Sequence, residues 1–390
     1  MPAGIYLHIP FCRSRCSYCD FATDVWRSHD AVERYVNALC QEIQGGNPSG
    51  SEGALQCSSG TLPTGRASAC ADTVYFGGGT PSLLEPGQVE QILDTVRTKF
   101  DISNDPEISM EMNPGTVTAE KLNSYRSLGV NRASFGVQTF NDRHLKLLAR
   151  GHDANDARET FRMLREAGFA NVSFDLIAGL PGQTLVDWKQ NLDEAVSMEP
   201  EHLSLYLLEV HEGTPLAEQI RSGRRPLPDE DLAAEMYELM LDHLARAGYE
   251  QYEISNFAKA GFESRHNTKY WRLDPVYGFG VSAHSFDGFQ RYSNERDTAT
   301  YVSAIETRQT TEVFREEINT ASEFVFLGLR LNRGIDLSEY KRKFGNDLLE
   351  RYSNELDTLK ANGLVENGNG IVRLTRKGML LSNEVFAAFV

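Results

Sequence analysis

Short apolar, β-branched runs alternate with helix-like spacings over the first half of the chain. The runs predict strands at residues 4–9, 73–76, 107–112, 132–137, 172–177 and 202–207. Apolar residues recur every three or four positions between them, which predicts helices at residues 31–44, 88–99, 118–127, 154–167 and 185–197. Strands alternating with helices imply an α/β fold with a parallel sheet, either doubly wound or curled into a barrel. In both architectures the ligand site lies at the carboxyl ends of the strands.

The pattern changes after the Pro226-Leu-Pro228 segment, which marks a joint. A long helix over residues 229–248 and an irregular, aromatic- and Gly-rich region over residues 251–292 are expected next. The last segment predicts helices at residues 337–343 and 348–361, a hairpin in LVENGNGIVRLT and a terminal helix, which together resemble a winged helix. We therefore divide the chain into a core (1–228), a middle segment (229–314) and an α+β C-terminal domain (315–390).

The charge and hydropathy of the chain indicate which kinds of partner, nucleic acid or membrane, are unfavourable. The 390 residues include 39 Lys and Arg against 55 Asp and Glu, for a net charge of −16, so the whole chain does not attract nucleic acid or an anionic membrane. Basic and acidic residues are balanced from Arg315 onward, which favours a packing or substrate-capping role for the winged-helix-like domain. No run approaches the ~18 to 20 apolar residues of a membrane span, and the N-terminus does not read as a signal peptide. We expect a cytoplasmic protein.

Three of the six cysteines (Cys12, Cys16 and Cys19) fall within eight residues, directly after the first predicted strand. A disulfide framework is typical of small secreted chains, so this spacing is better interpreted as a set of metal ligands. Three thiolates on one loop can bind three irons of a [4Fe–4S] cluster and leave the fourth iron open to another ligand. The alternatives to an iron–sulfur cluster are a zinc site that lacks one ligand and a chance clustering of cysteines.

The remaining cysteines carry weaker signals. Cys40 lies in a helical pattern and is expected in the core. Cys57 and Cys70 lie in residues 45–71, where nearly half the positions are Gly, Ser or Pro. We interpret that stretch as a flexible surface insertion without a catalytic role, although its two cysteines could pair or bind a metal.

Further polar and glycine-rich segments follow the predicted strands. The segment GGGTPS at residues 77–82 lets the backbone approach a ligand closely, or forms a plain tight turn; it lacks the pattern of a phosphate-binding loop. Glu111, Gln138 and Asp175 mark the ends of three more strands, and Arg150 can pair with a carboxylate. Each can belong to a structural network, but together they favour one shared polar ligand.

The segment YLHIPFCRSRCSYCDF resembles the radical S-adenosylmethionine (SAM) superfamily, and more narrowly its branch related to oxygen-independent coproporphyrinogen III oxidase. The likeness covers almost the whole chain. It implies a partial (β/α)6 barrel in which SAM chelates the open iron and is cleaved to methionine and a 5′-deoxyadenosyl radical. It also implies that Phe21 or Tyr18 packs near the adenine and that His8 supports the cysteine loop. The implied SAM contacts are Tyr6, Phe21, Gly78, Gly79, Thr80, Glu111, Gln138, Arg150 and Asp175.

Two departures from the oxidases change the expected function. Phe21 stands where the oxidases have a fourth cysteine, and the chain reaches Tyr6 almost at once, without their N-terminal extension. Both features are the pattern of HemW-type heme chaperones. The resemblance therefore implies a protein that binds heme and delivers it to apo-hemoproteins. Oxidative decarboxylation of coproporphyrinogen III and radical chemistry on another anionic substrate are the alternatives, so whether the chain is an enzyme stays open.

The same branch resembles the chain at one further motif, whose residues are His266, Asn267, Tyr270 and Trp271, followed by Tyr277, Gly278, Gly280 and Ala283-His284. Histidine is the commonest axial donor to heme iron, and aromatic side chains pack on the macrocycle. A packed loop with a core histidine is the alternative. The resemblance also implies an electron donor such as flavodoxin and a homodimer.

Overall fold

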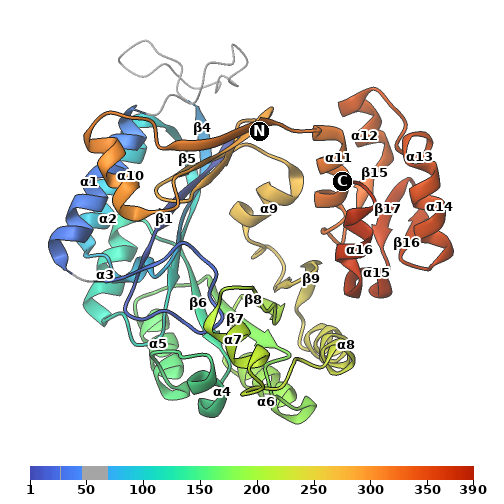
Figure 1. Cartoon of the computed structure of the whole chain (residues 1–390), viewed down its shortest axis with the longest axis horizontal. Helices are drawn as coiled ribbons and strands as arrows, with labels where there is room; N and C mark the ends of the chain where they lie inside the picture. Colours follow the sequence, from blue (N-terminus) through green and yellow to red (C-terminus); the bar gives the residue numbers. More distant parts are fainter. Residues whose placement is uncertain (27, 46–68) are drawn as a thin grey trace.

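The computed structural model describes residues 1–26, 28–45 and 69–390 (Figure 1). The six predicted strands are confirmed as neighbouring parallel strands in chain order. They are β1 (Ala3–Ile9), β4 (Cys70–Gly78), β5 (Asp101–Met112), β6 (Arg132–Gln138), β7 (Val172–Ala178) and β8 (His202–Leu207). Their carboxyl ends therefore meet along one edge, where the sequence places its candidate ligands.

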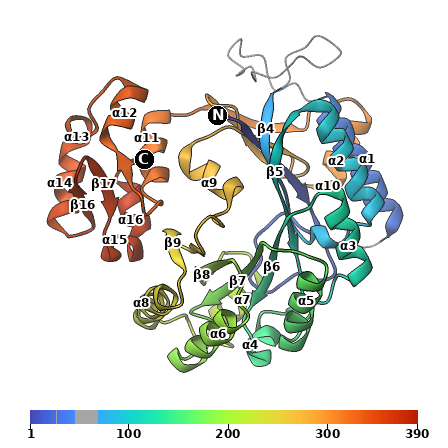
Figure 2. The same cartoon turned by 180° about the vertical axis from the view of Figure 1, so that it is seen from behind.

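Helices cover the outer face of the curved sheet, which stays an open barrel (Figures 1 and 2). The predicted helices are confirmed as α1 (His29–Gly45), α2 (Pro86–Lys99), α3 (Ala119–Leu128), α5 (Ala154–Glu166), α6 (Leu185–Ser197) and α8 (Glu230–Arg246). Their buried apolar faces pack on the sheet in the main core, which also includes Cys40, as predicted. Not predicted were the short helices α4 (Asp142–Leu147), α7 (Pro215–Arg221), α10 (Thr298–Glu306) and the 3₁₀ turn η1 (Pro81–Leu83).

The prediction of an irregular region at residues 251–292 is wrong. It holds most of β9 (Glu250–Glu253), then β10 (Asn256–Ala258), α9 (Arg265–Arg272), β11 (Val276–Phe279), β12 (His284–Phe286) and the start of β13 (Gln290–Asn294). Together with β14 (Glu312–Glu317) these strands extend both edges of the sheet, which has twelve strands within the described residues; β11 pairs with β1 as a further parallel strand. Strands this short contain too few alternations to be recognised, and long-range pairing stabilises them.

The C-terminal segment forms a second, smaller core. Its elements are α11 (Thr320–Gly328), β15 (Ile335–Asp336), α12 (Leu337–Phe344), α13 (Leu348–Arg351), α14 (Ser353–Ala361), β16 (Val365–Gly368), β17 (Ile371–Leu374), α15 (Arg376–Leu380) and α16 (Ser382–Ala387). The predicted hairpin is confirmed as β16–β17, whereas two short helices replace the single terminal helix. The boundary predicted at residue 315 falls inside β14, which pairs with β13 of the main sheet.

The predicted surface insertion at residues 45–71 is too long at its C-terminal end. Cys70 and Ala71 already belong to β4, where they pair with Asp101 and Ile102 of β5. Residues 46–68, including Cys57, lie outside the described residues. No helix in the described part of the chain is both long and apolar enough to cross a membrane.

Candidate functional site

The three clustered cysteines lie on a loop fixed at several points of its backbone. Cys12 ends β2 (Phe11–Cys12), and Cys16 and Cys19 follow before β3 (Asp24–Val25). All three are free thiols of intermediate exposure. Ser17 donates its backbone N–H to the carbonyl of Leu148 at 2.9 Å and its hydroxyl to the preceding carbonyl at 3.0 Å. The loop therefore presents its thiols from an anchored backbone.

Burial disfavours the charged form of these thiols. It raises the pKa of Cys12 to about 11 and also raises the pKa of Cys19. Thr80 Oγ1 donates to Cys12 Sγ at 3.6 Å, and Arg150 Nη1 donates to Cys16 Sγ at 3.4 Å. Coordination by a metal deprotonates a thiol outright, so iron would stabilise the thiolates that burial penalises. The donor set fits an iron–sulfur cluster.

The thiols are not arranged around one point. Among the described residues, no three His, Cys, Asp or Glu side chains are placed to hold a single metal ion. A [4Fe–4S] cluster makes a different demand, because each thiolate ligates its own iron. Three ligands from one loop fit that demand and leave one iron to an outside ligand.

The glycine segment passes directly beneath the cysteine loop. A Cβ on Gly79 would lie 2.6 Å from the carbonyl oxygen of Pro10, and a Cβ on Gly78 would lie 2.7 Å from the ring of His8. Gly78 also has φ +112°, in the region that favours glycine. The next amide, of Thr80, donates to the carbonyl of Phe11 at 2.8 Å. Glycine is required here because the two loops approach backbone to backbone.

His8 supports the cysteine loop, as expected. Its Nε2 donates to the carbonyl of Ala22 at 2.9 Å, and its Nδ1 lies 3.1 Å from the Tyr6 hydroxyl. Tyr6 in turn stacks on Tyr75, with ring centroids 6.2 Å apart. Tyr6 therefore faces the interior of the barrel, on a strand whose carboxyl end leads into the cysteines.

Two buried carboxylates lie near the carboxyl ends of β5 and β7, which are separated by β6. Glu111 accepts hydrogen bonds from the Tyr75 hydroxyl at 2.9 Å and from the backbone N–H of Gly78 at 3.0 Å. Asp175 accepts from Ser134 at 3.4 Å. Burial, with a smaller contribution from the charge of Asp175, raises the pKa of Glu111 to about 7, and burial also raises the pKa of Asp175. A buried carboxylate whose pKa is raised further by the charge of a second carboxylate favours a cationic ligand, such as an ammonium group.

Glu111→Gln is expected to stabilise the protein most at alkaline pH. Folding raises the pKa of Glu111 from 4.5 to about 7. Between these two pH values the folded protein therefore binds more protons than the unfolded chain. The free energy of unfolding therefore falls as pH rises through the window and stays lower above it. Gln carries no charge, so the variant should gain about 2 kcal/mol over wild type at about pH 8 and much less at about pH 5. Urea unfolding at both pH values measures this, with exposed Glu120→Gln as control; an equal gain at both would contradict it.

Arg150 connects the cysteine loop to the strand ends. Besides Cys16, it donates from Nη2 to Asn113 Oδ1 at 2.6 Å and to the carbonyl of Gly136 at 2.7 Å. Its buried Nε has no hydrogen-bond partner. The Gln138 side chain lies over the same glycine: a Cβ on Gly136 would be 2.6 Å from Gln138 Nε2. Gln138 itself has a positive φ of +64°. The unpaired Arg150 Nε–H, close to the polar Gln138 amide, could donate to a ligand that has acceptor oxygens.

Asn113 is a site residue that the sequence analysis missed. It accepts from Arg150 and donates from Nδ2 to Thr80 Oγ1 at 2.7 Å, and so joins three predicted site residues into one chain of hydrogen bonds that ends on Cys12. It follows Glu111 by two residues. Because side chains two residues apart in an extended chain point to the same face, Asn113 is expected on the same face as Glu111. That spacing is the signal that could have found it.

The two aromatic candidates on the cysteine loop differ in position. Tyr18 is partly buried and packs against the small apolar cluster that includes Leu148 and Leu216. Phe21 is 65% exposed. A contact of either residue with adenine remains a prediction.

The predicted heme motif lies on α9, which packs between β4 and the C-terminal segment (Figures 1 and 2). His266 is 1% exposed, and burial lowers its pKa to about 3. Its Nδ1 lies 2.8 Å from Thr73 Oγ1 and its Nε2 lies 3.3 Å from the Tyr270 hydroxyl. Trp271 lies under the guanidinium of Arg330, 4.3 Å from the ring centroid. Neither nitrogen of His266 is free for iron here, which favours the alternative of a core histidine.

Comparison with known proteins identifies the family. Residues 64–195 match the radical SAM superfamily, and residues 316–381 match the HemN C-terminal domain. The heme chaperone HemW of Bacillus subtilis is 39% identical over 99% of this chain and 98% of its own length. The chain belongs to the HemW family. A second HemW, from Lactococcus lactis, is 34% identical over 100% of this chain and 97% of its own.

A solved structure extends the likeness beyond HemW itself. Coproporphyrinogen III oxidase (HemN) from Escherichia coli is 25% identical, with a TM-score of 0.82, over 100% of this chain and 90% of that protein. The radical SAM barrel and the C-terminal domain of this HemW family member thus share their architecture with that oxidase.

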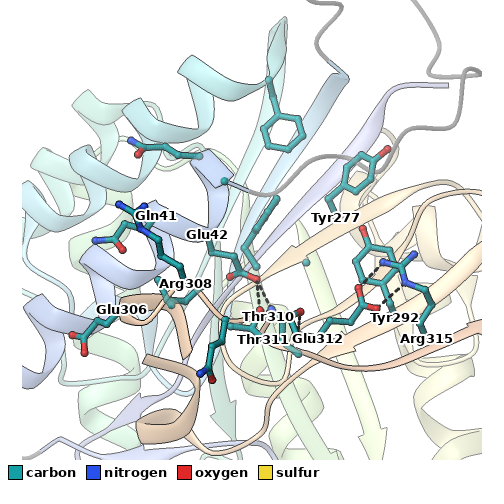
Figure 3. Close-up of a pocket in the computed structure, with 18 residues that line it drawn as sticks. Gln41, Glu42, Tyr277, Tyr292, Glu306, Arg308, Thr310, Thr311, Glu312 and Arg315 are labelled. Atoms are coloured by element: carbon teal, nitrogen blue, oxygen red, sulfur yellow. Dashed lines mark hydrogen bonds and ion pairs between the residues drawn. The ribbon is translucent and has the colours of Figure 1, made fainter. Parts of the chain in front are cut away.

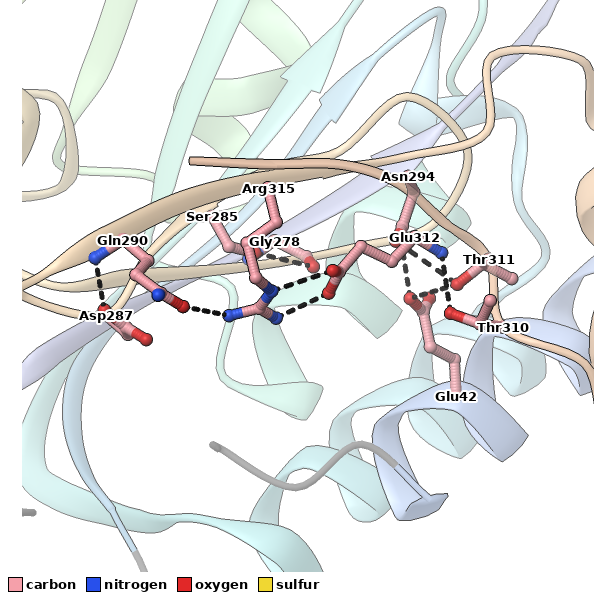
Figure 4. A network of polar contacts seen from close by, with 10 residues as sticks. All are labelled: Glu42, Gly278, Ser285, Asp287, Gln290, Asn294, Thr310, Thr311, Glu312 and Arg315. Carbon is pink, nitrogen blue, oxygen red and sulfur yellow. Dashed lines mark hydrogen bonds and ion pairs between the residues drawn. The ribbon is translucent and has the colours of Figure 1, made fainter. Parts of the chain in front are cut away.

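A cavity of about 920 Å³ lies elsewhere in this HemW fold, between α1, α10 and strands β11, β13 and β14 (Figure 3). Glu42, which lines it, accepts a hydrogen bond from Asn294 (Figure 4). It also accepts hydrogen bonds from the Tyr301 hydroxyl and the backbone N–H of Gly280. Arg315 donates to Glu312 and Gln290. Tyr277 and Gly278, which follow the heme motif in the sequence, line the cavity, whereas the predicted cluster and SAM residues and the four motif residues on α9 do not.

Proposed function

We propose that this protein is a heme chaperone that binds a [4Fe–4S] cluster, SAM and heme, and delivers heme to apo-hemoproteins. The observation that carries the proposal is the 39% identity to a heme chaperone over nearly the whole chain. The exposed Phe21 supports it, because the oxidases of the related branch have a fourth cysteine at that position.

The proposal assigns the cluster to Cys12, Cys16 and Cys19. SAM would bind along the adjoining strand ends, where Glu111 offers a carboxylate to its ammonium and Arg150 a guanidinium to its carboxylate. The other assigned contacts are Tyr6, Phe21, Gly78, Gly79, Thr80, Gln138 and Asp175. When bound, the cluster supplies the electron that cleaves the sulfonium of SAM.

Three further assignments complete the proposal. An electron donor such as flavodoxin reaches the cluster through the partly exposed cysteine loop. The protein works in the cytoplasm, where thiol ligands stay reduced. It forms a homodimer, and α9, with Asn267, Tyr270 and Trp271, contributes to heme binding.

Heme binding without turnover is the expected result for anaerobically reconstituted protein. Hemin should bind and then pass to an apo-hemoprotein, which heme spectra of the two separated proteins would record. Incubation with coproporphyrinogen III, SAM and a reductant should give no protoporphyrinogen. The fold shared with HemN at a TM-score of 0.82 makes that oxidase the second candidate, and porphyrinogen decarboxylation would overturn the chaperone proposal.

A further inference from the structure

A row of polar side chains crosses the inner face of the barrel. Strand pairing aligns Tyr6 of β1 with Tyr75 of β4, Tyr75 with Ser109 of β5, and Ser109 with Arg132 of β6. The next residue on β6, Ala133, belongs to the main core beneath the outer helices. Because successive side chains of a strand point to opposite faces, Arg132 points into the barrel.

Arg132 is a buried guanidinium without a partner in the described part of the chain. The residue is 1% exposed, its Nε makes no hydrogen bond, and its guanidinium forms no ion pair. Burial raises the pKa of Asp175 and the charge of Arg132 opposes that rise, so the two lie near one another without pairing. Arginine stays protonated in proteins, so it cannot avoid the cost of burial by losing its charge. Such a group requires an acceptor from outside the chain.

The neighbouring Ser109 is unsatisfied as well. It is 0% exposed, and its hydroxyl makes no hydrogen bond to any described residue. Paired residues on adjacent strands lie about 5 Å apart and on the same face, so Ser109 and Arg132 stand side by side inside the barrel. Buried polar groups are nearly always hydrogen-bonded, so two adjacent exceptions point to one shared ligand with acceptor oxygens.

The histidine nearby on β8 is neutral and already engaged. Burial, with the charge of Arg132 as a smaller cause, lowers the pKa of His202 well below its usual range. Its Nδ1 lies 2.8 Å from Ser173 Oγ, and its Nε2 lies 2.8 Å from the Tyr252 hydroxyl. His202 therefore neither adds a second positive charge nor competes with Arg132 for an anion.

We propose that Arg132 and Ser109 bind a small carboxylate, such as formate or acetate, at a site separate from the predicted SAM contacts. The two oxygens of a carboxylate match the planar guanidinium as a bidentate pair, and one of them also accepts from the Ser109 hydroxyl. One negative charge balances the one unpaired cation, whereas a phosphate dianion would bring a second charge close to the buried Asp175. The complete burial of Arg132 restricts the ligand to a short one. The site does not depend on heme.

Acetate is the probe that tests this proposal in the reconstituted full-length protein. Saturation-transfer NMR should show acetate bound to wild type, and the urea midpoint should rise with acetate, because a ligand of the folded state stabilises it. Sodium chloride at equal ionic strength is the reference for general salt effects. Arg132→Met should weaken acetate binding by about tenfold or more, since it removes the charged donor. Arg158→Met, on the outer helix α5, is the matched control and should respond like wild type.

Ser109→Ala keeps the proposal testable if Arg132→Met does not fold. It removes one neutral hydrogen bond and should weaken acetate binding about fivefold. Equal responses to acetate and chloride, or a wild-type acetate response in both variants, would overturn the site. Competition between acetate and SAM, added without a reductant, would also overturn it, because the anion would then be the carboxylate of SAM. Failure to bind hemin would instead remove the proposed function and leave this site standing.

Discussion

Replacing any one of Cys12, Cys16 and Cys19 with alanine should abolish the iron–sulfur cluster. Each thiolate would hold a separate iron, so no remaining ligand substitutes for a lost one. Their partly buried loop disfavours free thiolates, because burial raises the pKa of Cys12 to about 11 and raises that of Cys19. Anaerobic reconstitution, followed by iron and acid-labile sulfide counts and the brown absorption of the cluster, measures the loss.

Cys40→Ala is the matched control for these variants. Cys40 is a free thiol too, but it is buried in the main core, where its Sγ lies 3.9 Å from the carbonyl of Gln91. The variant should lose about 1 kcal/mol of stability and keep its full cluster. Equal cluster loss in Cys40→Ala, or wild-type protein that contains zinc and no sulfide, would contradict the ligand assignment.

The part of the fold that the sequence predicts well is the part with long periodic patterns. The inner strands β1, β6 and β7 are buried on both faces, and the helices between them carry one apolar stripe each. The alternation of these strands and helices is therefore sufficient to place the motifs at the strand ends along one edge of the sheet. The hydrogen bonds between Gly78 and Glu111, and those of Asn113 with Thr80 and Arg150, then depend on register and side-chain geometry, which composition does not encode.

The role of α9 illustrates what pattern alone leaves open. The sequence allows His266 to be either a heme ligand or a core residue. Glu107 of β5 fixes the position of the helix that carries it, since its carboxylate accepts the first backbone N–H groups of α9, from Arg265 and His266, each at 3.0 Å. That contact spans about 160 residues and holds the helix inside the barrel. Nothing local to the motif could have shown it.

Arg150→Met should weaken SAM binding by tenfold or more and destabilise the fold. The side chain donates to Asn113, to the carbonyl of Gly136 and to Cys16, so its loss leaves three acceptors without their charged donor. Hydrogen bonds to charged groups are worth about 1.5–3 kcal/mol each when they are buried, and about 1.4 kcal/mol corresponds to a tenfold change in affinity. Urea unfolding and calorimetric SAM titration of the reconstituted protein measure the two effects.

Arg158→Met separates this effect from the general cost of removing an arginine. Arg158 lies on the outer helix α5 and pairs with Glu194, and its side chain is 48% exposed, so its loss should cost less than about 1 kcal/mol and leave SAM binding intact. If Arg150→Met were destabilised but still bound SAM with wild-type affinity, Arg150 would have only a structural role, in connecting the loops, and the predicted SAM contact would be wrong. Arg150→Lys sharpens the distinction, because it keeps the charge but cannot reach Cys16, Asn113 and Gly136 together. If positive charge alone were sufficient, Lys would restore SAM affinity; if the planar guanidinium positions the ligand, Lys should remain as weak as Met.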